Sequence, residues 1–202
     1  MSIKEFDGDL QGNQEVAIGI DQSLTGFALS IVSVNSPQQH RTWVFKSQYR
    51  GVQRLDDIRS WLFSKLVELN TSGYTVVNVA MEGTVLQSQA ASILGELAGV
   101  TKLELFNFFG PDRRLGTDGS LNSALPLQVP PMTLKKYATG KGTAKKQEML
   151  LQIYKRWGVE FNDDNAADAY ALARLATGSA IDAIERETQE KLKDPKFRDT
   201  IL

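Results

Sequence analysis

The 202-residue sequence contains no cysteine and only one histidine, His40. The absence of cysteine excludes disulfide bonds, thiolate zinc sites and cysteine nucleophiles, and it fits a reducing cytoplasm. His40 follows the polar turn Ser36-Pro37-Gln38-Gln39, so we expect an exposed side chain there rather than a catalytic one. Most histidine-based chemistry is therefore excluded as well.

Long hydrophobic runs are also missing. Residues 1–15 are polar and acidic and lack the apolar core of a signal peptide, and no later run approaches the roughly 20 apolar residues of a membrane span. We therefore expect a cytoplasmic protein with no membrane partner. A chain of this length is sufficient for one well-buried α/β domain and short for two.

The formal net charge is −1, and a balance so near zero argues on its own against a nucleic-acid partner. The charge is unevenly distributed, however, because one stretch is strongly basic and is opposed only by Glu148. Its cations are Lys135, Lys136, Lys141, Lys145, Lys146, Lys155 and Arg156. Lys141, Lys145 and Lys146 flank two glycines and the start of an expected helix, where ammonium groups and free backbone N–H groups favour phosphate. The alternative interpretation is a solvated helix face.

The hydrophobic pattern predicts alternating strands and helices. Strands are expected at 16–20, 27–34, 42–45, 75–81 and 125–129, with 102–109 as a further candidate. Helices are expected at 52–69, 88–99, 144–157 and 163–173, with a helical turn from Thr133 and a charged peripheral or dimer-packing helix after Gly178. Residues 110–125 are predicted to form a long loop, which is the best candidate for a mobile or substrate-contacting segment. The order combines an antiparallel hairpin with parallel crossovers.

Three acidic residues stand where predicted elements end or begin at one edge of such a sheet. Asp21 follows the first strand, Glu82 follows the strand at 75–81, and Asp168 lies in the first turns of the last long helix. Each has an ordinary alternative, namely an Asx-turn, a strand-end surface charge and helix capping, respectively. Together, carboxylates without histidine or cysteine form the ligand set that Mg²⁺ or Mn²⁺ selects.

The last long helix offers further oxygen ligands. At about 100° per residue, Asp164, Asn165 and Asp168 share one helix face, so two of them can approach one ion. Alanines at 166, 167 and 169 keep the neighbouring surface small enough for close packing.

Four sequence runs now resemble a known family in order and spacing. AIGIDQSLTGFALSIV, VAMEGTVLQSQAASILGELAGV, GKGTAKKQEM and DDNAADAYALA are similar to the successive motifs of RuvC-like Holliday junction resolvases, including their phage-type branch, over roughly residues 16–176. The resemblance implies an α/β, ribonuclease H-like fold with a mixed five-stranded sheet flanked by helices. Within it we expect a flexible leader at 1–15, a single nuclease domain at 16–178 and a helical extension at 179–202.

The same resemblance implies a site and a reaction. Asp21, Glu82 and Asp168 become metal ligands, and the fourth ligand is Asp164, which we prefer as a carboxylate, or Asn165, which stands at the more usual spacing. Two Mg²⁺ ions, which Mn²⁺ replaces, would catalyse phosphodiester hydrolysis, with Lys146 stabilising the transition state. The expected DNA-binding residues are Lys135, Lys136, Lys141, Lys145, Lys146, Val85 and Leu86, the last two where some members present an aromatic wedge.

The implied substrate is a four-way DNA junction, cut by a homodimer with one site per subunit, in the cytoplasm of a bacterial cell or a phage-infected host. Two alternatives remain open. One is another ribonuclease H-like nuclease, acting on branched DNA or RNA–DNA hybrids, and the other is a non-catalytic DNA-binding module on the same fold.

Overall fold

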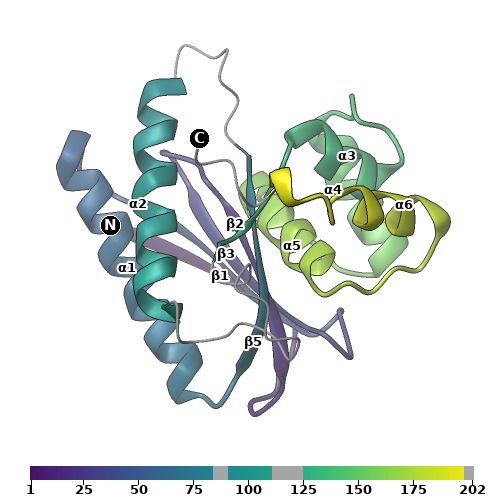
Figure 1. Cartoon of the computed structure of the whole chain (residues 1–202), viewed down its shortest axis with the longest axis horizontal. Helices are drawn as coiled ribbons and strands as arrows, with labels where there is room; N and C mark the ends of the chain where they lie inside the picture. Colours follow the sequence, from purple (N-terminus) through teal and green to yellow (C-terminus); the bar gives the residue numbers. More distant parts are fainter. Residues whose placement is uncertain (84–90, 111–124, 198–202) are drawn as a thin grey trace.

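The protein is described by a computed structural model over residues 1–83, 91–110 and 125–197. Its centre is one mixed sheet in the order β1-β4-β3-β2-β5-β6 (Figure 1). The strands are β1 Ser2–Asp7, β2 Glu15–Asp21, β3 Phe27–Ser33, β4 His40–Lys46, β5 Thr75–Glu82 and β6 Leu127–Val129. The pairs β1–β4, β4–β3 and β3–β2 are antiparallel. Strand β5 pairs parallel with β2 and with β6.

The sheet therefore has six strands where five were expected. The added strand, β1, lies within the segment interpreted as a flexible leader and pairs antiparallel with β4, Ser2 opposite Lys46. Its residues are mostly exposed, and a charged sequence is typical of a strand at a sheet edge. Because its residues are mostly polar, the hydrophobic pattern did not predict this strand.

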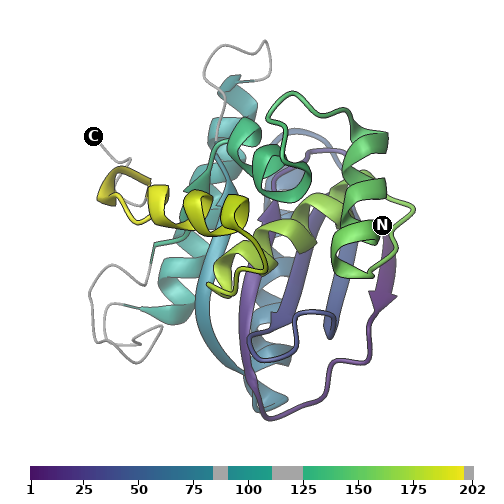
Figure 2. The same cartoon turned by 90° about the vertical axis from the view of Figure 1, so that its right-hand side faces the viewer.

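Helices cover both faces of the sheet. They are α1 Gly51–Thr71, α2 Ala91–Phe109, α3 Pro131–Thr139, α4 Lys146–Trp157, α5 Asp164–Ala176 and α6 Ala183–Lys191, followed by the short 3-10 helix Pro195–Phe197. One face carries α1 and α2, and the other carries α5, with α3, α4 and α6 beside it (Figures 1 and 2). In the described part of the chain, no helix is long and apolar enough to cross a membrane.

Two local expectations were wrong. Residues 102–109 form the second half of α2 rather than a strand, because Leu97, Thr101, Leu105 and Phe109 recur at helical spacing and are buried on one side. His40 is buried rather than exposed, with 4% of its surface accessible, because it begins β4 under the rings of Phe161 and Tyr170. This burial lowers the pKa of His40 to about 4.

Strand β2 separates the two cores by strict alternation. Val16, Ile18 and Ile20 pack on the side of α1 and α2, whereas Ala17 packs on the side of α5. Gly19 lies on that same side, and a Cβ atom there would overlap the backbone of Ala169 and Ala173. Only glycine permits α5 to approach β2 this closely, so the Gly19 contact fixes the position of α5 over the sheet.

Candidate active site

Two carboxylates meet at one end of the sheet. Asp21 and Glu82 are the last residues of the parallel strands β2 and β5, and the register pairs Ile20 with Met81 just before them. By alternation both side chains emerge on the α5 face, since Ala17 and Ala80 belong to the core beneath α5. Asp21 is 5% exposed, and its carboxyl group lies close enough to that of Glu82 for each to shift the pKa of the other.

Helix α5 supplies the third carboxylate. Asp163 caps the helix, because its side chain accepts hydrogen bonds from the backbone N–H groups of Asn165 and Ala166 at 3.1 and 3.3 Å. Asp168 follows one turn later and is close enough to Asp21 and Glu82 for their charges to act on one another. Three of the four residues predicted as metal ligands thus lie within electrostatic reach of one another.

The pKa values of all three carboxyl groups are raised above their ordinary values. Burial raises the pKa of Asp21 well above its ordinary value, and the charges of Glu82 and Asp168 raise it further. Burial, then Glu82 and Asp164, raise the pKa of Asp168 to about 7. The pKa of Glu82 is also raised by burial, against the hydrogen bond from Asp21 and the nearby charges of Lys135 and Lys146. A positive charge at this position would relieve the repulsion.

The two candidates for a fourth ligand differ in their surroundings. Asp164 forms an ion pair with Lys146, whose Nζ lies 3.0 Å from Oδ2, and its charge acts on Asp168. The side chain of Asn165 instead lies over Gly26 in the β2–β3 turn, where a Cβ atom would approach its Nδ2 to 2.5 Å. Asp164 therefore faces the carboxylate cluster and its lysine, whereas Asn165 packs against the turn.

The predicted DNA-binding lysines fall into two groups. Lys146 and Lys135 lie near the cluster, and their charges lower the pKa of Glu82 and Asp168. Lys136 pairs with Glu187 at 3.0 Å and Lys141 with Glu148 at 3.6 Å, while Lys145 is the exposed residue preceding α4. Val85 and Leu86, together with most of the predicted loop at 110–125, lie outside the described residues.

One residue that supports the site, Gln22, was not predicted from the sequence. Gln22 is buried directly after Asp21, and its Nε2 donates a hydrogen bond to the carbonyl oxygen of Glu82 at 2.8 Å. This bond ties the end of β2 to the end of β5. A glutamine in a turn-like run gives no sequence signal for such a role.

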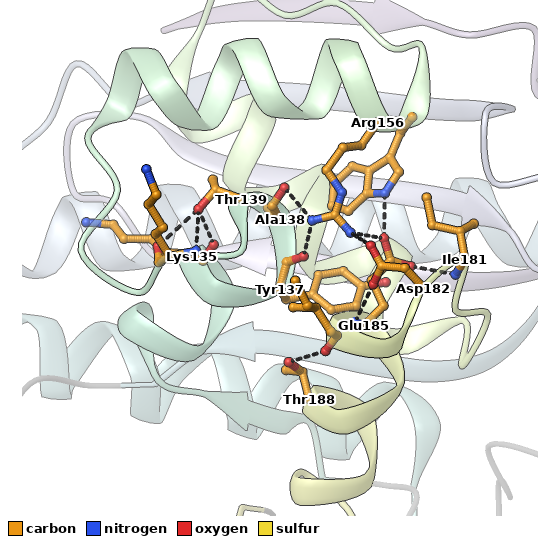
Figure 3. A network of polar contacts seen from close by, with 12 residues as sticks. Lys135, Tyr137, Ala138, Thr139, Arg156, Ile181, Asp182, Glu185 and Thr188 are labelled. Atoms are coloured by element: carbon orange, nitrogen blue, oxygen red, sulfur yellow. Dashed lines mark hydrogen bonds and ion pairs between the residues drawn. The ribbon is translucent and has the colours of Figure 1, made fainter.

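A buried polar network holds the two lysine-bearing helices together (Figure 3). From α4, Arg156 donates to the carbonyl oxygens of Tyr137 and Ala138 at 2.9 and 3.0 Å, and it pairs with Asp182 and Glu185 at 2.6 and 2.9 Å. The Glu185 carboxylate also accepts from the Nε1 of Trp157 at 2.8 Å. Helix α6 is thus joined to α3 and α4. The network holds together the two helices that carry Lys135 and Lys146.

The donor chemistry at this end of the sheet suits a hard divalent cation. Asp21, Glu82 and Asp168 offer only oxygen ligands, and their mutual repulsion falls when a cation binds. Within residues 1–83, 91–110 and 125–197, no three acidic or histidine side chains form a ready-made metal-binding cluster. The carboxylates fit a metal by their chemistry, and their role as ligands is a proposal.

The backbone matches solved structures of one class of protein. A structure of Thermus thermophilus RuvC aligns with a TM-score of 0.59 and 20% identity over 88% of this chain and 96% of that one. T. thermophilus RuvC in complex with Holliday junction substrate aligns with a TM-score of 0.58 and 21% identity, over 79% of this chain and 90% of that one.

At these identities the similarity shows the fold, so the predicted ribonuclease H-like, RuvC-like fold is confirmed as a single domain with a six-stranded mixed sheet. No family model matches the chain, and no curated protein matches it in sequence.

Replacing Asp168 by Asn should stabilise the metal-free protein at high pH. The pKa of Asp168 is about 7 in the folded protein against an ordinary value of 3.8, so between these values the folded state holds a proton that the unfolded state has released. Stability from this proton is complete below about pH 4 and is lost as pH rises through 7. We expect the variant to exceed the wild type by about 1–3 kcal/mol at pH 8 and to lose this advantage near pH 4.

Thermal or urea unfolding in chelator, repeated across this pH range, measures the difference. Asp56→Asn is the matched control, because Asp56 is exposed on α1 and pairs with Arg59 of the same helix. If both substitutions changed the free energy of unfolding equally and independently of pH, the pKa of Asp168 would not be raised in the folded protein.

Proposed function

We propose that this protein is a metal-dependent endodeoxyribonuclease that cuts four-way DNA junctions. The observation that carries the proposal is the convergence of Asp21, Glu82 and Asp168 beside Lys146, at the end of a sheet with a RuvC-like backbone. A buried cluster of like charges with one adjacent cation destabilises the fold, and such arrangements are typical of catalytic centres.

Asp21, Glu82 and Asp168, with Asp164 as the fourth, would hold Mg²⁺ or Mn²⁺. Bound there, the metal would supply an activated water and stabilise the leaving oxygen of a phosphodiester. The protein's own groups complete the site. Lys146 is oriented toward the cluster by its 3.0 Å ion pair with Asp164 and offsets negative charge on a reacting phosphate.

The substrate assignment rests on three lines of support. Lys135 and Lys146 border the carboxylates, and Lys145 is exposed and directly precedes Lys146 in the chain. The T. thermophilus protein of the same fold is solved with a Holliday junction substrate. We assign this chain to the same reaction, and to the cytoplasm of a bacterial cell or a phage-infected host. We place it in the phage-type branch on its sequence motifs.

A homodimer would place two sites on the two strands of a junction. Helix α2 has the better surface for it. Leu103 and Phe106 are 58% and 41% exposed, Ile93 is exposed as well, and a Cβ atom at Gly95 or Gly99 would meet nothing. Glycine inside a helix costs about 1 kcal/mol relative to alanine, and close approach of a second helix would account for two of them.

Cleavage of a synthetic four-way junction tests the function. The wild type should cut it with Mg²⁺ or Mn²⁺ and stop when chelator is added, and Asp168→Asn should lower the single-turnover rate at least about 100-fold. Parallel assays on flaps, RNA–DNA hybrids and linear duplex test selectivity. Equal cutting of all substrates would indicate a less selective nuclease, and unchanged cutting in excess chelator would falsify metal dependence.

The same assay distinguishes the two fourth-ligand candidates. Asp164→Asn should abolish cleavage and leave junction affinity intact or higher, because a negative charge near the phosphate is removed. Asn165→Ala is the matched control and should be mild, since Asn165 packs on Gly26. The reverse pattern would make Asp164 a partner of Lys146 only.

Light scattering of surface variants tests the dimer. Leu103→Glu combined with Phe106→Glu should convert a dimer to a monomer, because two charges would enter an apolar interface on each subunit. Ile181→Glu is the control, because Ile181 is exposed in the segment after Gly178, where a dimer-packing helix was also predicted. A wild type that is monomeric with and without junction would count against the resolvase assignment, and dissociation by Ile181→Glu alone would place the interface on the tail.

A further inference from the structure

A second basic segment lies at the carboxylate end of the sheet, outside the lysines considered so far. Between Lys46 and Arg54 the sequence KSQYRGVQR holds three cations and no carboxylate. It connects the end of β4 to the start of α1. Because β4 runs antiparallel to β3, which runs antiparallel to β2, the ends of β4 and β2 lie at the same edge.

The sheet register places Lys46 relative to the cluster. Asp21 pairs with Ala28, Ala28 pairs with Val44, and Lys46 follows Val44 by two residues. Residues two apart face the same side of a strand, and Val44 packs in the core under α5, so Lys46 emerges on the same face as Asp21. Two strand spacings separate β2 from β4, about 10 Å.

The segment is ordered by its own hydrogen bonds. The backbone N–H of Tyr49 donates to Oγ of Ser47 at 3.1 Å, and Nε of Arg54 donates to the carbonyl oxygen of Tyr49 at 2.8 Å. Lys46 and Arg50 remain exposed on this braced loop. Bracing reduces the conformational entropy lost when the loop binds a ligand.

Several other surface cations are paired with carboxylates. Arg41, Arg59 and Lys65 each lie within 4 Å of a carboxylate. In the part of the chain that the structure describes, neither Lys46 nor Arg50 has such a partner. Tyr49 is exposed between them, and cations beside an exposed aromatic ring favour nucleic acid over a protein carboxylate.

We propose that Lys46 and Arg50 form a second phosphate-binding surface for the DNA strand that crosses the carboxylates. Lys135 approaches the cluster from α3, which directly follows β6, whereas Lys46 and Arg50 border it from the β4 side. Cations on both sides hold the strand upstream and downstream of the scissile phosphate. The inference rests on the proposed function, since it takes DNA as the ligand.

The test measures binding without cleavage. Fluorescence anisotropy of a labelled four-way junction, titrated in chelator at several salt concentrations, gives the affinity and its salt dependence. Lys46→Ala and Arg50→Ala should each weaken binding up to about eightfold at 0.1 M salt, and each should lower the slope of log affinity against log salt by about 0.9. Their double variant should combine both effects, while Lys46→Arg should retain wild-type affinity.

Lys191→Ala is the matched control, because Lys191 is an exposed lysine at the far end of α6. Affinities and slopes for Lys46→Ala and Arg50→Ala equal to those of Lys191→Ala would overturn the proposal, as would a wild type that binds no DNA. The proposed function fails separately, since it is judged by metal-dependent cleavage. If the protein binds DNA through Lys46 and Arg50 but does not cut junctions, the DNA-binding surface is supported and the nuclease function is not.

Discussion

Helix α5 lies directly on β2 because position 19 is glycine. A side chain at position 19 would occupy the space of Ala169 and Ala173, so the absence of a Cβ atom lets the helix lie directly on β2. Asp21 stands two residues further along the strand, on the same face, and Asp168 stands one residue before Ala169 in the helix. One close backbone contact therefore brings a strand carboxylate and a helix carboxylate together, and the β2–β5 register adds Glu82.

This assembly is electrostatically unfavourable by itself, and the surrounding chain is arranged to offset it. Burial raises the pKa values of all three carboxyl groups, and repulsion from neighbouring carboxylates raises those of Asp21 and Asp168 further. Lys135 and Lys146 lower the pKa values of Glu82 and Asp168. The lysines are held by α3 and α4, which Arg156 joins to each other and to α6. Helix α6 thus contacts the two helices that carry these lysines.

Much of this arrangement was predictable because it depends on local pattern. Asp21 and Glu82 end short apolar strands, and Asp168 lies on an alanine-rich helix, so the edge where they meet follows from the order of elements. Features set by distant contacts were not predictable. The polar strand β1 needs β4 as a partner, the burial of His40 needs Phe161 and Tyr170, and the pairing of Lys136 with Glu187 needs α6. In 102–109, an apolar run after Gly99 suits either a strand or a continuing helix, and packing against the core decides for helix.

The proposed divalent-cation site of Asp21, Glu82 and Asp168 depends on the close contact at Gly19. Titration of the protein with Mn²⁺, followed by the electron paramagnetic resonance signal of the free ion, measures that site without any nucleic acid. We expect saturable binding to the wild type and at least about tenfold weaker binding to Asp21→Asn, because one full charge is lost from the ligand set. Equal Mn²⁺ affinity of the folded wild type and Asp21→Asn proteins, or no saturable binding to the wild type, would show that these carboxylates do not form a cation site.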